Sequence, residues 1–437
     1  MKESEIKSII AEKLGIESLN DMQRAMAEKS SSQELVLLAP TGSGKTLAFA
    51  MNLMKNLKEP TGYVQAVIIA PSRELTIQIY NVIRPISGEF KVTCCYGGHK
   101  FEDEKNSLEV VPDILVSTPG RLLDHINRGN VELYQTRILI IDEFDKSLEL
   151  GFSEEMKRII RRMKNVSRRI LTSATQIDSF PEFIPMKNAL TINYLQENKT
   201  ENRLTIYNVH SEEKDKLQAL LQLLNNLENG KTIIFLNHRE SAERVFAFLE
   251  SKRLSAVLYH GGLEQNDREK AIAMLNNGSK MILVTTDLGA RGLDIEKVKS
   301  IIHYHLPVNV ETYTHRNGRT ARINESGAIY IITSDAEKIP DFIEFDEDFK
   351  LDKDATLKIK NDYSTLFFSA GKKEKISRGD VVGFLISKGG LNADEIGKID
   401  VFDHHTLVAV RKDLAKATLS KIAKEKIKNK RIRITLA

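Results

Sequence analysis

Cysteine is scarce in this sequence, and long apolar runs are missing. The two cysteines, Cys94 and Cys95, are adjacent and have neither CxxC spacing nor the spacing of zinc ligands. No apolar run approaches the roughly 20 residues that cross a bilayer. The charged start MKESEIKSII lacks the apolar core and small-residue cleavage site of a signal peptide. These absences predict a cytoplasmic protein without structural disulfides, structural zinc or contact with a membrane.

Length, composition and charge favour a soluble protein with more than one domain. A chain of 437 residues is too long for one compact core, so two or three domains are expected. The net charge of +4 is uneven, because residues 361–437 hold 16 Lys and Arg against 9 Asp and Glu. A basic tail on a near-neutral body predicts an appendage that binds a polyanion, although a solvated tail with surplus lysine explains the charge equally well.

Short apolar runs that end in turn residues recur along the chain. They are LVLLAPTG, AVIIAPS, ILVSTPG, ILIIDEFD and ILTSAT in the first half, then TIIFLN, AVLYHGG, MILVTTD, SIIHYHLP and AIYIITS. Such runs, separated by helical stretches, predict parallel strands that are buried on both faces. We therefore expect two tandem doubly wound α/β domains, at residues 1–200 and 201–360, joined by the polar segment 195–202.

The last part of the chain, residues 361–437, follows a different pattern. Its order is strand STLFFSAG, helix RGDVVGFLISKG, strands IGKIDVF and TLVAV, helix LAKATLSKIAKEKI and strand RIRITLA. That βαββαβ order predicts a small α+β domain like the RNA-recognition fold (RRM). Phe367 and Phe368 point to opposite faces of the first strand, so at least one of them is expected in the core.

The segment APTGSGKT, residues 39–46, lies between a predicted strand and a predicted helix. Its glycines let backbone N–H groups turn toward phosphate oxygens, Lys45 would reach the β- and γ-phosphates, and Thr46 would hold Mg²⁺. Ala39 occupies the place of the first glycine of the general phosphate-loop pattern. The alternative is an ordinary glycine-rich turn. The nucleotide-binding residues predicted here are Thr41, Gly42, Ser43, Gly44, Lys45 and Thr46.

A second strand end, ILIIDEFD, supplies the carboxylates Asp142, Glu143 and Asp145. A phosphate-loop enzyme needs an acid at the carboxyl end of a neighbouring strand to position its metal ion. We expect Asp142 to position Mg²⁺ and Glu143 to polarise the attacking water. Alone, the motif also fits an exposed acidic turn.

With these motifs in order, the sequence resembles the DEAD-box RNA helicases of superfamily 2 across both α/β domains, which implies RecA-like folds, ATP and RNA. The resemblance implies a nucleotide site that also includes Gln23, Gly292 and Asp294, and coupling residues Asp145, Ser173, Thr175 and His315. The implied RNA-binding residues are Pro71, Arg73, Gly97, Gly98, Thr118, Arg121, Asn237, Gln265, Arg268 and Thr286. The segment HRNGRTAR offers the arginine fingers Arg319 and Arg322.

The physical logic supports this resemblance. A charged phosphoryl-transfer transition state needs positive groups on its oxygens, and Arg319 and Arg322 would supply them from the other domain, opposite Lys45 and Glu143. Hydrolysis then requires the two domains to close. RNA contacts on loops suggest sugar–phosphate recognition with little base reading, and the family implies local strand separation rather than long translocation.

Three departures from the family pattern stand out. Phe144 replaces Ala in the namesake motif, beside the catalytic acids. Asn317 and Ala321 replace Ile or Val and Gly, and Ile6 takes roughly the place of an aromatic residue upstream of Gln23. None of these changes removes a catalytic group.

The tail resembles the RNA-binding module of a bacterial DEAD-box subfamily, the DbpA-like helicases, which implies large-subunit ribosomal RNA as the target. The matching stretches are SAGKKEKISRGDVVGFL and IGKIDVFDHHTLVAV. Because TLVAVRK carries no aromatic residue, we expect phosphate contacts from a loop rather than base stacking on the sheet. The predicted loop residues are Lys372, Lys373, Lys375 and Arg378; the alternative is that they are merely solvated.

The leading interpretation is therefore a monomeric RNA-dependent ATPase that remodels short duplexes during large ribosomal subunit assembly. Phe144 motivates an alternative, a nucleotide-gated RNA clamp that couples hydrolysis poorly. A DNA helicase of the same superfamily and a purely structural ribosome-binding protein are further alternatives, and both fit the motif set less well.

Overall fold

The computed structural model describes residues 3–29, 34–98, 100–177, 179–186, 188–195, 204–287, 295, 297–320 and 327–437. The chain forms two compact units that separate between residues 203 and 204. Gly292, Asp294, Arg322 and Ala321, together with residues 196–202 of the expected linker, lie outside the described residues. Among the described helices, none is long and apolar enough to cross a membrane.

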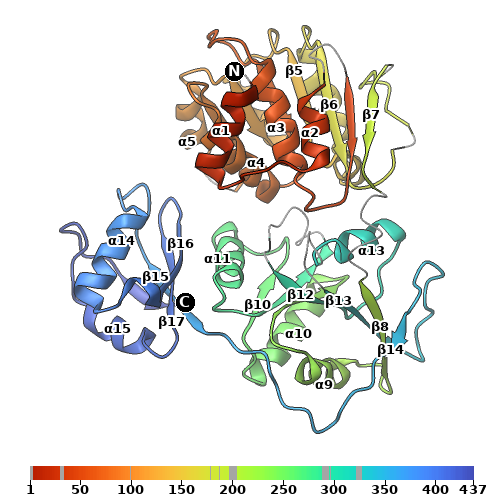
Figure 1. Cartoon of the computed structure of the whole chain (residues 1–437), viewed down its shortest axis with the longest axis vertical. Coiled ribbons are helices and arrows are strands. Elements are labelled where there is room, and N and C mark those ends of the chain that lie inside the picture. Colours follow the sequence, from red (N-terminus) through yellow and green to blue (C-terminus); the bar gives the residue numbers. More distant parts are fainter. Residues whose placement is uncertain are drawn as a thin grey trace. The chain divides into compact units, whose positions relative to one another are not determined.

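The first unit, in which Figure 1 labels β5, β6 and β7, is built on a seven-stranded sheet. The strand order is β3-β4-β2-β5-β6-β1-β7, and every pairing is parallel. Its strands are β1 Leu35–Leu38, β2 Ala66–Ile69, β3 Val92–Cys95, β4 Ile114–Ser117, β5 Ile138–Ile141, β6 Arg168–Ser173 and β7 Leu190–Asn193. Its helices are α1 Glu3–Leu14, α2 Asp21–Ala27, α3 Lys45–Asn56, α4 Arg73–Ile86, α5 Phe101–Leu108, α6 Pro119–Asn127, α7 Phe144–Glu149 and α8 Ser153–Arg162.

Helices cover both faces of this sheet. Side chains of α1, α2, α3 and α4 form one core with alternate strand residues such as Leu35 and Ile68. Leu122 of α6 and Met156 of α8 form a second core with the intervening residues, such as Val36 and Val67. Because both faces are buried, the central strands are continuous apolar runs, as the sequence predicted.

The second unit begins with another seven-stranded parallel sheet, in the order β10-β11-β9-β12-β13-β8-β14. Its strands are β8 Thr205–Ser211, β9 Lys231–Leu236, β10 Ala256–Tyr259, β11 Ile282–Thr286, β12 Val298–His303, β13 Ala328–Ser334 and β14 Glu347–Asp348. Its described helices include α9 Leu217–Asn226, α10 Arg239–Ser251, α11 Gln265–Asn276 and α13 Val310–Asn317.

The same unit ends in a four-stranded antiparallel sheet with the order β16-β17-β15-β18. The elements are β15 Tyr363–Phe368, α14 Arg378–Phe384, β16 Ile396–Val401, β17 Thr406–Arg411, α15 Ala415–Ile422 and β18 Ile434–Leu436. Phe368 is in its core, whereas Phe367 lies on the other face, 5.7 Å from the His405 ring. The predicted fold class, two RecA-like domains and a small RRM-like domain, is confirmed.

Four strands were not among the predicted apolar runs. They are β3, β7, β8 and β14. Three of them lie at sheet edges, and β8 lies next to the edge strand β14, where one face or more is partly exposed. Polar residues are tolerated there, so these strands lack the continuous apolar signal.

Candidate nucleotide and RNA site

The phosphate loop leads directly into helix α3. Gly42 and Gly44 have φ values of 82° and 88°, in the left-handed region that favours glycine. Lys45 is the first residue of α3, and its ammonium donates to the carbonyl oxygens of Ala39 at 2.7 Å and Pro40 at 2.9 Å. The loop therefore curls around a buried positive charge, which suits it to phosphate groups.

Gln23 is anchored beside this loop. Asn20 and Gln23 form a reciprocal cap at the start of α2, with hydrogen bonds of 2.9 and 3.0 Å. The Gln23 amide also donates to the carbonyl of Gly44 at 3.4 Å, and the Asn20 amide donates to that of Ser43 at 3.0 Å. A Cβ atom at Gly44 would lie only 2.5 Å from Gln23 Nε2. The predicted adenine-reading glutamine and the phosphate loop are thus joined by hydrogen bonds.

Ile6, the residue found in place of an aromatic, is buried in the core beneath α1. Its side chain packs inside the domain, so it offers no surface for a base.

Asp142 follows strand β5 and is 2% exposed. Its carboxylate accepts hydrogen bonds from the Thr172 hydroxyl and, at 3.1 Å, from the Glu143 N–H. Burial raises the pKa of Asp142, while the Thr172 hydroxyl and the Lys45 ammonium act in the opposite direction. Because β1 and β5 are parallel strands of one sheet, the phosphate loop and Asp142 lie at the same carboxyl edge of that sheet.

Glu143 has a φ of 48°, which is unusual for a residue with a side chain. Its N–H donates to both Asp142 and the Thr172 hydroxyl, the latter at 3.2 Å. These bonds hold the strained backbone in place. Such strain is commonly found where a catalytic side chain is aimed at its substrate.

Phe144 is fully buried in the core below the acids, with its ring 6.4 Å from that of Phe180. Three of the residues implied for coupling lie together, because the Thr175 hydroxyl donates to Asp145 at 2.8 Å and the Ser173 hydroxyl bonds with the Thr175 backbone at 2.7 and 2.9 Å. The Phe144 ring packs in the apolar core, and the clamp alternative, which concerns the coupling of hydrolysis, stays a hypothesis.

The predicted RNA loops of the first domain lie at the ends of β3 and β4. The Arg73 guanidinium packs against Gly97 and Gly98, and a Cβ atom at Gly98 would collide with it. Gly98 also has a φ of 102°, so two independent reasons require glycine there. Arg73, Gly97 and Gly98, which the family resemblance implies as RNA-binding residues, thus lie together.

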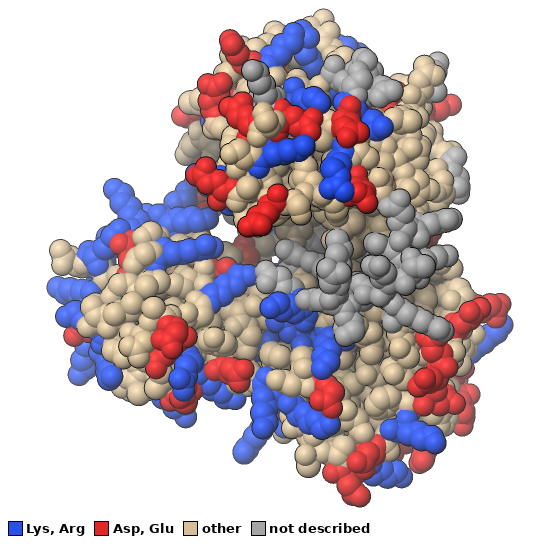
Figure 2. Space-filling model, in the orientation of Figure 1, with Lys and Arg blue, Asp and Glu red and all other residues tan. Residues whose placement is uncertain are grey.

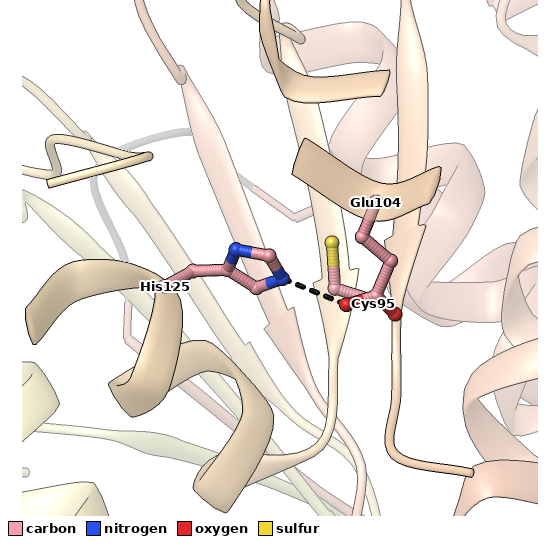
Figure 3. A group of neighbouring side chains, drawn as sticks. All are labelled: Cys95, Glu104 and His125. Atoms are coloured by element: carbon pink, nitrogen blue, oxygen red, sulfur yellow. Dashed lines mark hydrogen bonds and ion pairs between the residues drawn. The ribbon is translucent and has the colours of Figure 1, made fainter. Parts of the chain in front are cut away.

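A buried group beside these loops, Cys95, Glu104 and His125, has metal-ligand side chains within 4.8 Å of one another (Figure 3). A metal ion does not fit it. Burial, together with the Glu104 charge, raises the pKa of the Cys95 thiol well above its usual range, so the thiol stays protonated. The Glu104 carboxylate already accepts from Tyr96 N–H, Arg121 and His125. The sequence motifs gave no hint of this arrangement.

In the second unit, Arg316 of α13 is 1% exposed and joins three predicted motifs. Its guanidinium donates to both carboxylate oxygens of Asp287 at 2.5 and 2.7 Å, to Asn237 Oδ1 at 2.7 Å and to the His305 carbonyl at 2.7 Å. The Asn237 amide also donates to the Leu306 carbonyl at 3.1 Å. The Asn237 side chain, predicted to bind RNA, is therefore engaged inside its domain.

Asn317 has a partner that accounts for its presence in the motif. Its Oδ1 lies 2.9 Å from Nε2 of His303, and His303 is fully buried. Burial, reinforced by the Arg316 charge, lowers the pKa of His303 to about 3, so the ring is neutral at physiological pH. Arg319, which follows the end of α13 in the HRNGRTAR motif, is 4% exposed. His315 of the same motif lies about one turn before it, on α13.

The remaining predicted residues of this domain lie at element ends. Thr286 is the last residue of β11 and is buried. Gln265 begins α11 and its amide donates to Glu269 at 3.2 Å, while Arg268 donates to the Leu263 carbonyl at 3.2 Å.

The basic loop of the C-terminal domain is exposed and held by its backbone. Lys372, Lys373, Lys375 and Arg378 all point to solvent. The Lys372 and Lys373 N–H groups each donate at 2.9 Å to carbonyls of the turn at residues 402–403. Lys428 and Lys430, which sequence reasoning missed, donate to loop carbonyls at 3.0 and 2.8 Å. Figure 2 shows the resulting concentration of basic side chains on this domain.

The face of the C-terminal sheet that points away from its own core contacts α11 and the turn after it. The Thr365 hydroxyl is buried and lies 3.0 Å from Asn277 Nδ2 and 2.6 Å from Ser279 Oγ. Lys270 sits 5.1 Å from the centre of the Phe367 ring. This face, which binds RNA in many RRM-like domains, is partly occupied by the chain itself.

Two parallel α/β domains, with a phosphate loop and strand-end acids in the first, define a nucleotide-driven motor of the helicase type. Comparison with known proteins makes the class specific. Residues 20–183 match the DEAD/DEAH box helicase model, residues 215–324 match the helicase conserved C-terminal domain, and residues 365–436 match the DbpA RNA binding domain.

Full-length relatives agree with these matches. The chain is 31% identical to the ATP-dependent RNA helicase DbpA of Escherichia coli, and 30% identical to that of Bacillus subtilis; each alignment covers 93% of this chain and 91% of the relative. The structure of Dbp5 of S. cerevisiae bound to RNA and ADP BeF3 superposes with a TM-score of 0.67 at 25% identity, over 76% of this chain and 87% of that one. The chain belongs to the DEAD-box ATP-dependent RNA helicases and hydrolyses ATP.

Proposed function

We propose that this helicase couples ATP hydrolysis to local separation of short RNA duplexes during assembly of the large ribosomal subunit. The observation that carries the proposal is the combination of a nucleotide site, with its Asp145–Thr175 contact intact, and a C-terminal domain that exposes a basic loop. We further propose that it works in the cytoplasm as a monomer, with domains at 1–200, 201–360 and 361–437.

The residues of the first domain suit ATP with Mg²⁺. The raised pKa of the buried Asp142 indicates a carboxylate that a cation would stabilise in its charged form. Asp142 and the Thr46 hydroxyl would hold Mg²⁺, which supplies charge neutralisation on the phosphate oxygens. Lys45 would bind the β- and γ-phosphates, and Gln23 would read the adenine.

Glu143 is proposed to polarise the attacking water. Hydrogen bonds from its backbone N–H to Asp142 and Thr172 fix the point from which its side chain starts. Arg319 and Arg322 are proposed to complete the site when the domains close, together with Gly292 and Asp294. Asp145, Ser173, Thr175 and His315 would report nucleotide state to the RNA loops.

RNA would lie on the loops of both domains, contacting Pro71, Arg73, Gly97, Gly98, Thr118 and Arg121 in the first and Gln265, Arg268 and Thr286 in the second. These contacts address the sugar–phosphate backbone, which does not carry sequence information directly. Selection of a ribosomal RNA element would therefore depend on the C-terminal domain. Its exposed lysines fit a phosphate-binding role, which predicts strong salt dependence.

The test is steady-state ATP hydrolysis by the full chain with no RNA, with generic single-stranded RNA and with large-subunit ribosomal RNA. Glu143→Gln is the blank. We expect selective stimulation by ribosomal RNA, and loss of that selectivity but not of generic stimulation when Lys372, Lys373 and Lys375 are changed to glutamate. Equal stimulation by every RNA would discard the targeting role, and DNA as effective as RNA would discard the RNA assignment.

A further inference from the structure

We infer that Glu104 is a positioning residue for RNA binding, which fixes the two RNA-contacting loops of the first domain relative to each other. The inference rests on the RNA contacts proposed above for Gly97, Gly98 and the segment Thr118–Arg121. Glu104 is buried and lies outside every motif named above, and its carboxylate would fix the positions of those contacts relative to one another.

The Glu104 cluster consists of Tyr96, Glu104, Arg121 and His125. Glu104 lies on α5 and is 3% exposed. One carboxylate oxygen accepts from the Tyr96 N–H at 2.7 Å. The other accepts from Arg121 Nε at 2.5 Å and from His125 Nε2 at 2.7 Å. A buried carboxylate needs such partners. Removing either the carboxylate or its partners leaves charged and polar groups unpaired.

The Glu104 cluster begins at the residue after the last hydrogen-bonded pair of β3 and β4. Strands β3 and β4 pair in parallel up to Cys95 and Ser117, and the Thr118 N–H donates to the Cys95 carbonyl at 3.2 Å. Tyr96 is the next residue of the first strand, directly before Gly97 and Gly98. Its N–H turns to Glu104, so the glycine pair starts from a fixed point.

Glu104 also fixes the other loop. Arg121 is the last residue of the TPGR segment, its side chain is 14% exposed, and its guanidinium stacks over the Phe101 ring at 4.8 Å. His125, one turn further along α6, is held from both sides. Its Nδ1 lies 3.1 Å from the Asn130 amide nitrogen, and its Nε2 lies 2.7 Å from the Glu104 carboxylate. The negative charge of Glu104 is matched by Arg121.

Because both loops are tied to one carboxylate, losing it should loosen the RNA surface without touching the nucleotide site. The variants are Glu104→Ala, which removes all three acceptor contacts, and Glu104→Gln, which keeps an acceptor but loses the charge opposite Arg121. The matched control is Glu102→Ala on the same helix, whose side chain is 71% exposed.

The measurements are the RNA concentration that gives half-maximal ATPase stimulation, the maximal rate, the KM for ATP and the melting temperature, all on the full chain. We expect Glu104→Ala to raise the half-stimulating RNA concentration about tenfold, in keeping with loss of a charge-assisted hydrogen bond. Glu104→Gln should fall between it and wild type. The KM for ATP and the rate at saturating RNA should stay unchanged, as should every parameter of Glu102→Ala.

An unchanged half-stimulating RNA concentration in both Glu104 variants, with RNA stimulation intact in wild type, overturns the inference and leaves the proposed function standing. If Glu104→Ala does not fold, Glu104→Gln decides by the same criterion. A wild-type enzyme that RNA does not stimulate overturns the proposed function, and the inference with it.

Discussion

In each of the two helicase domains, one buried charged side chain hydrogen-bonds to several separate segments, and the two charges have opposite sign. In the first, the Glu104 carboxylate collects three donors from two loops. In the second, Arg316, Asp287, Asn237 and His303 form what we call the Arg316 cluster, in which a guanidinium collects acceptors from three segments. A guanidinium has five donors in a rigid fork, whereas a carboxylate accepts over a broad range of directions. The second domain should therefore tolerate substitution of its central charge less well than the first.

The largest expected effect is from Arg316→Ala, which leaves Asp287 and the Asn237 carbonyl without their main donor. Losing one partner of a buried pair typically costs about 3–5 kcal/mol. Urea-induced unfolding of the full chain, followed by circular dichroism, should show the transition of the second unit shifted to lower urea. The control is Arg244→Ala, which removes an ion pair whose side chains are 61% and 45% exposed. Equal shifts in the two variants would contradict the buried role of Arg316.

Acid should weaken the second unit through His303. Its folded pKa of about 3 lies below the ordinary value of 6.5, so the unfolded chain binds the proton more readily between these values. The free energy of unfolding should therefore fall as pH drops below about 6.5 and stop falling from this source near pH 3. The slope is about 1.4 kcal/mol per pH unit at most. His303→Asn should flatten the dependence measured by urea unfolding at several pH values, and parallel curves would show that the group does not titrate on unfolding.

A smaller effect is expected from Asn317→Ile, which installs a residue usual in the family. It removes the partner of His303 Nε2 and leaves a buried polar group unpaired, at a cost of about 1–3 kcal/mol. The double variant His303→Asn, Asn317→Ile, compared with both single variants in a thermodynamic cycle, should show coupling between the two positions. Strict additivity would mean that the hydrogen bond contributes nothing.

The smallest effect is expected from exposed ion pairs, one in each unit. Lys105–Glu102 in the first unit and Arg244–Asp215 in the second are solvent-exposed, and such pairs contribute about 0–1 kcal/mol. Charge removal there should change neither stability nor RNA response. A large effect would show that position in the domain, rather than burial of the charge, decides the outcome.

Much of the nucleotide site could be predicted from the sequence because its residues lie in contiguous motifs. Residues 39–46 and Asp142–Asp145 follow apolar strands, so their positions at one sheet edge follow from the fold. Glu104 could not be predicted, because its three partners are 8, 17 and 21 residues away and no repeat or motif links them. Its role arises only when the sheet places two strand ends side by side.

Local reasoning also failed where partial exposure weakens the hydrophobic signal. The edge strand β14 is two residues long, Glu347–Asp348, and lies outside the apolar runs from which the strands were predicted. It pairs with β8 through backbone groups, which leave no mark in the side chains. The sequence likewise marked Asn317 as a departure, but only the structure provided its partner.

Glu104 is inferred to position the RNA loops of the first domain without taking part in nucleotide binding. RNA affinity and ATP affinity of Glu104→Gln and Arg316→Lys, measured side by side with a non-hydrolysable ATP analogue, separate the two roles. We expect Glu104→Gln to weaken RNA binding alone, whereas Arg316→Lys should weaken both, because its cluster joins α13 to the ends of β9 and β11. If Glu104→Gln impairs ATP binding as much as RNA binding, the RNA loops and the nucleotide site share one support and Glu104 does not serve RNA binding alone.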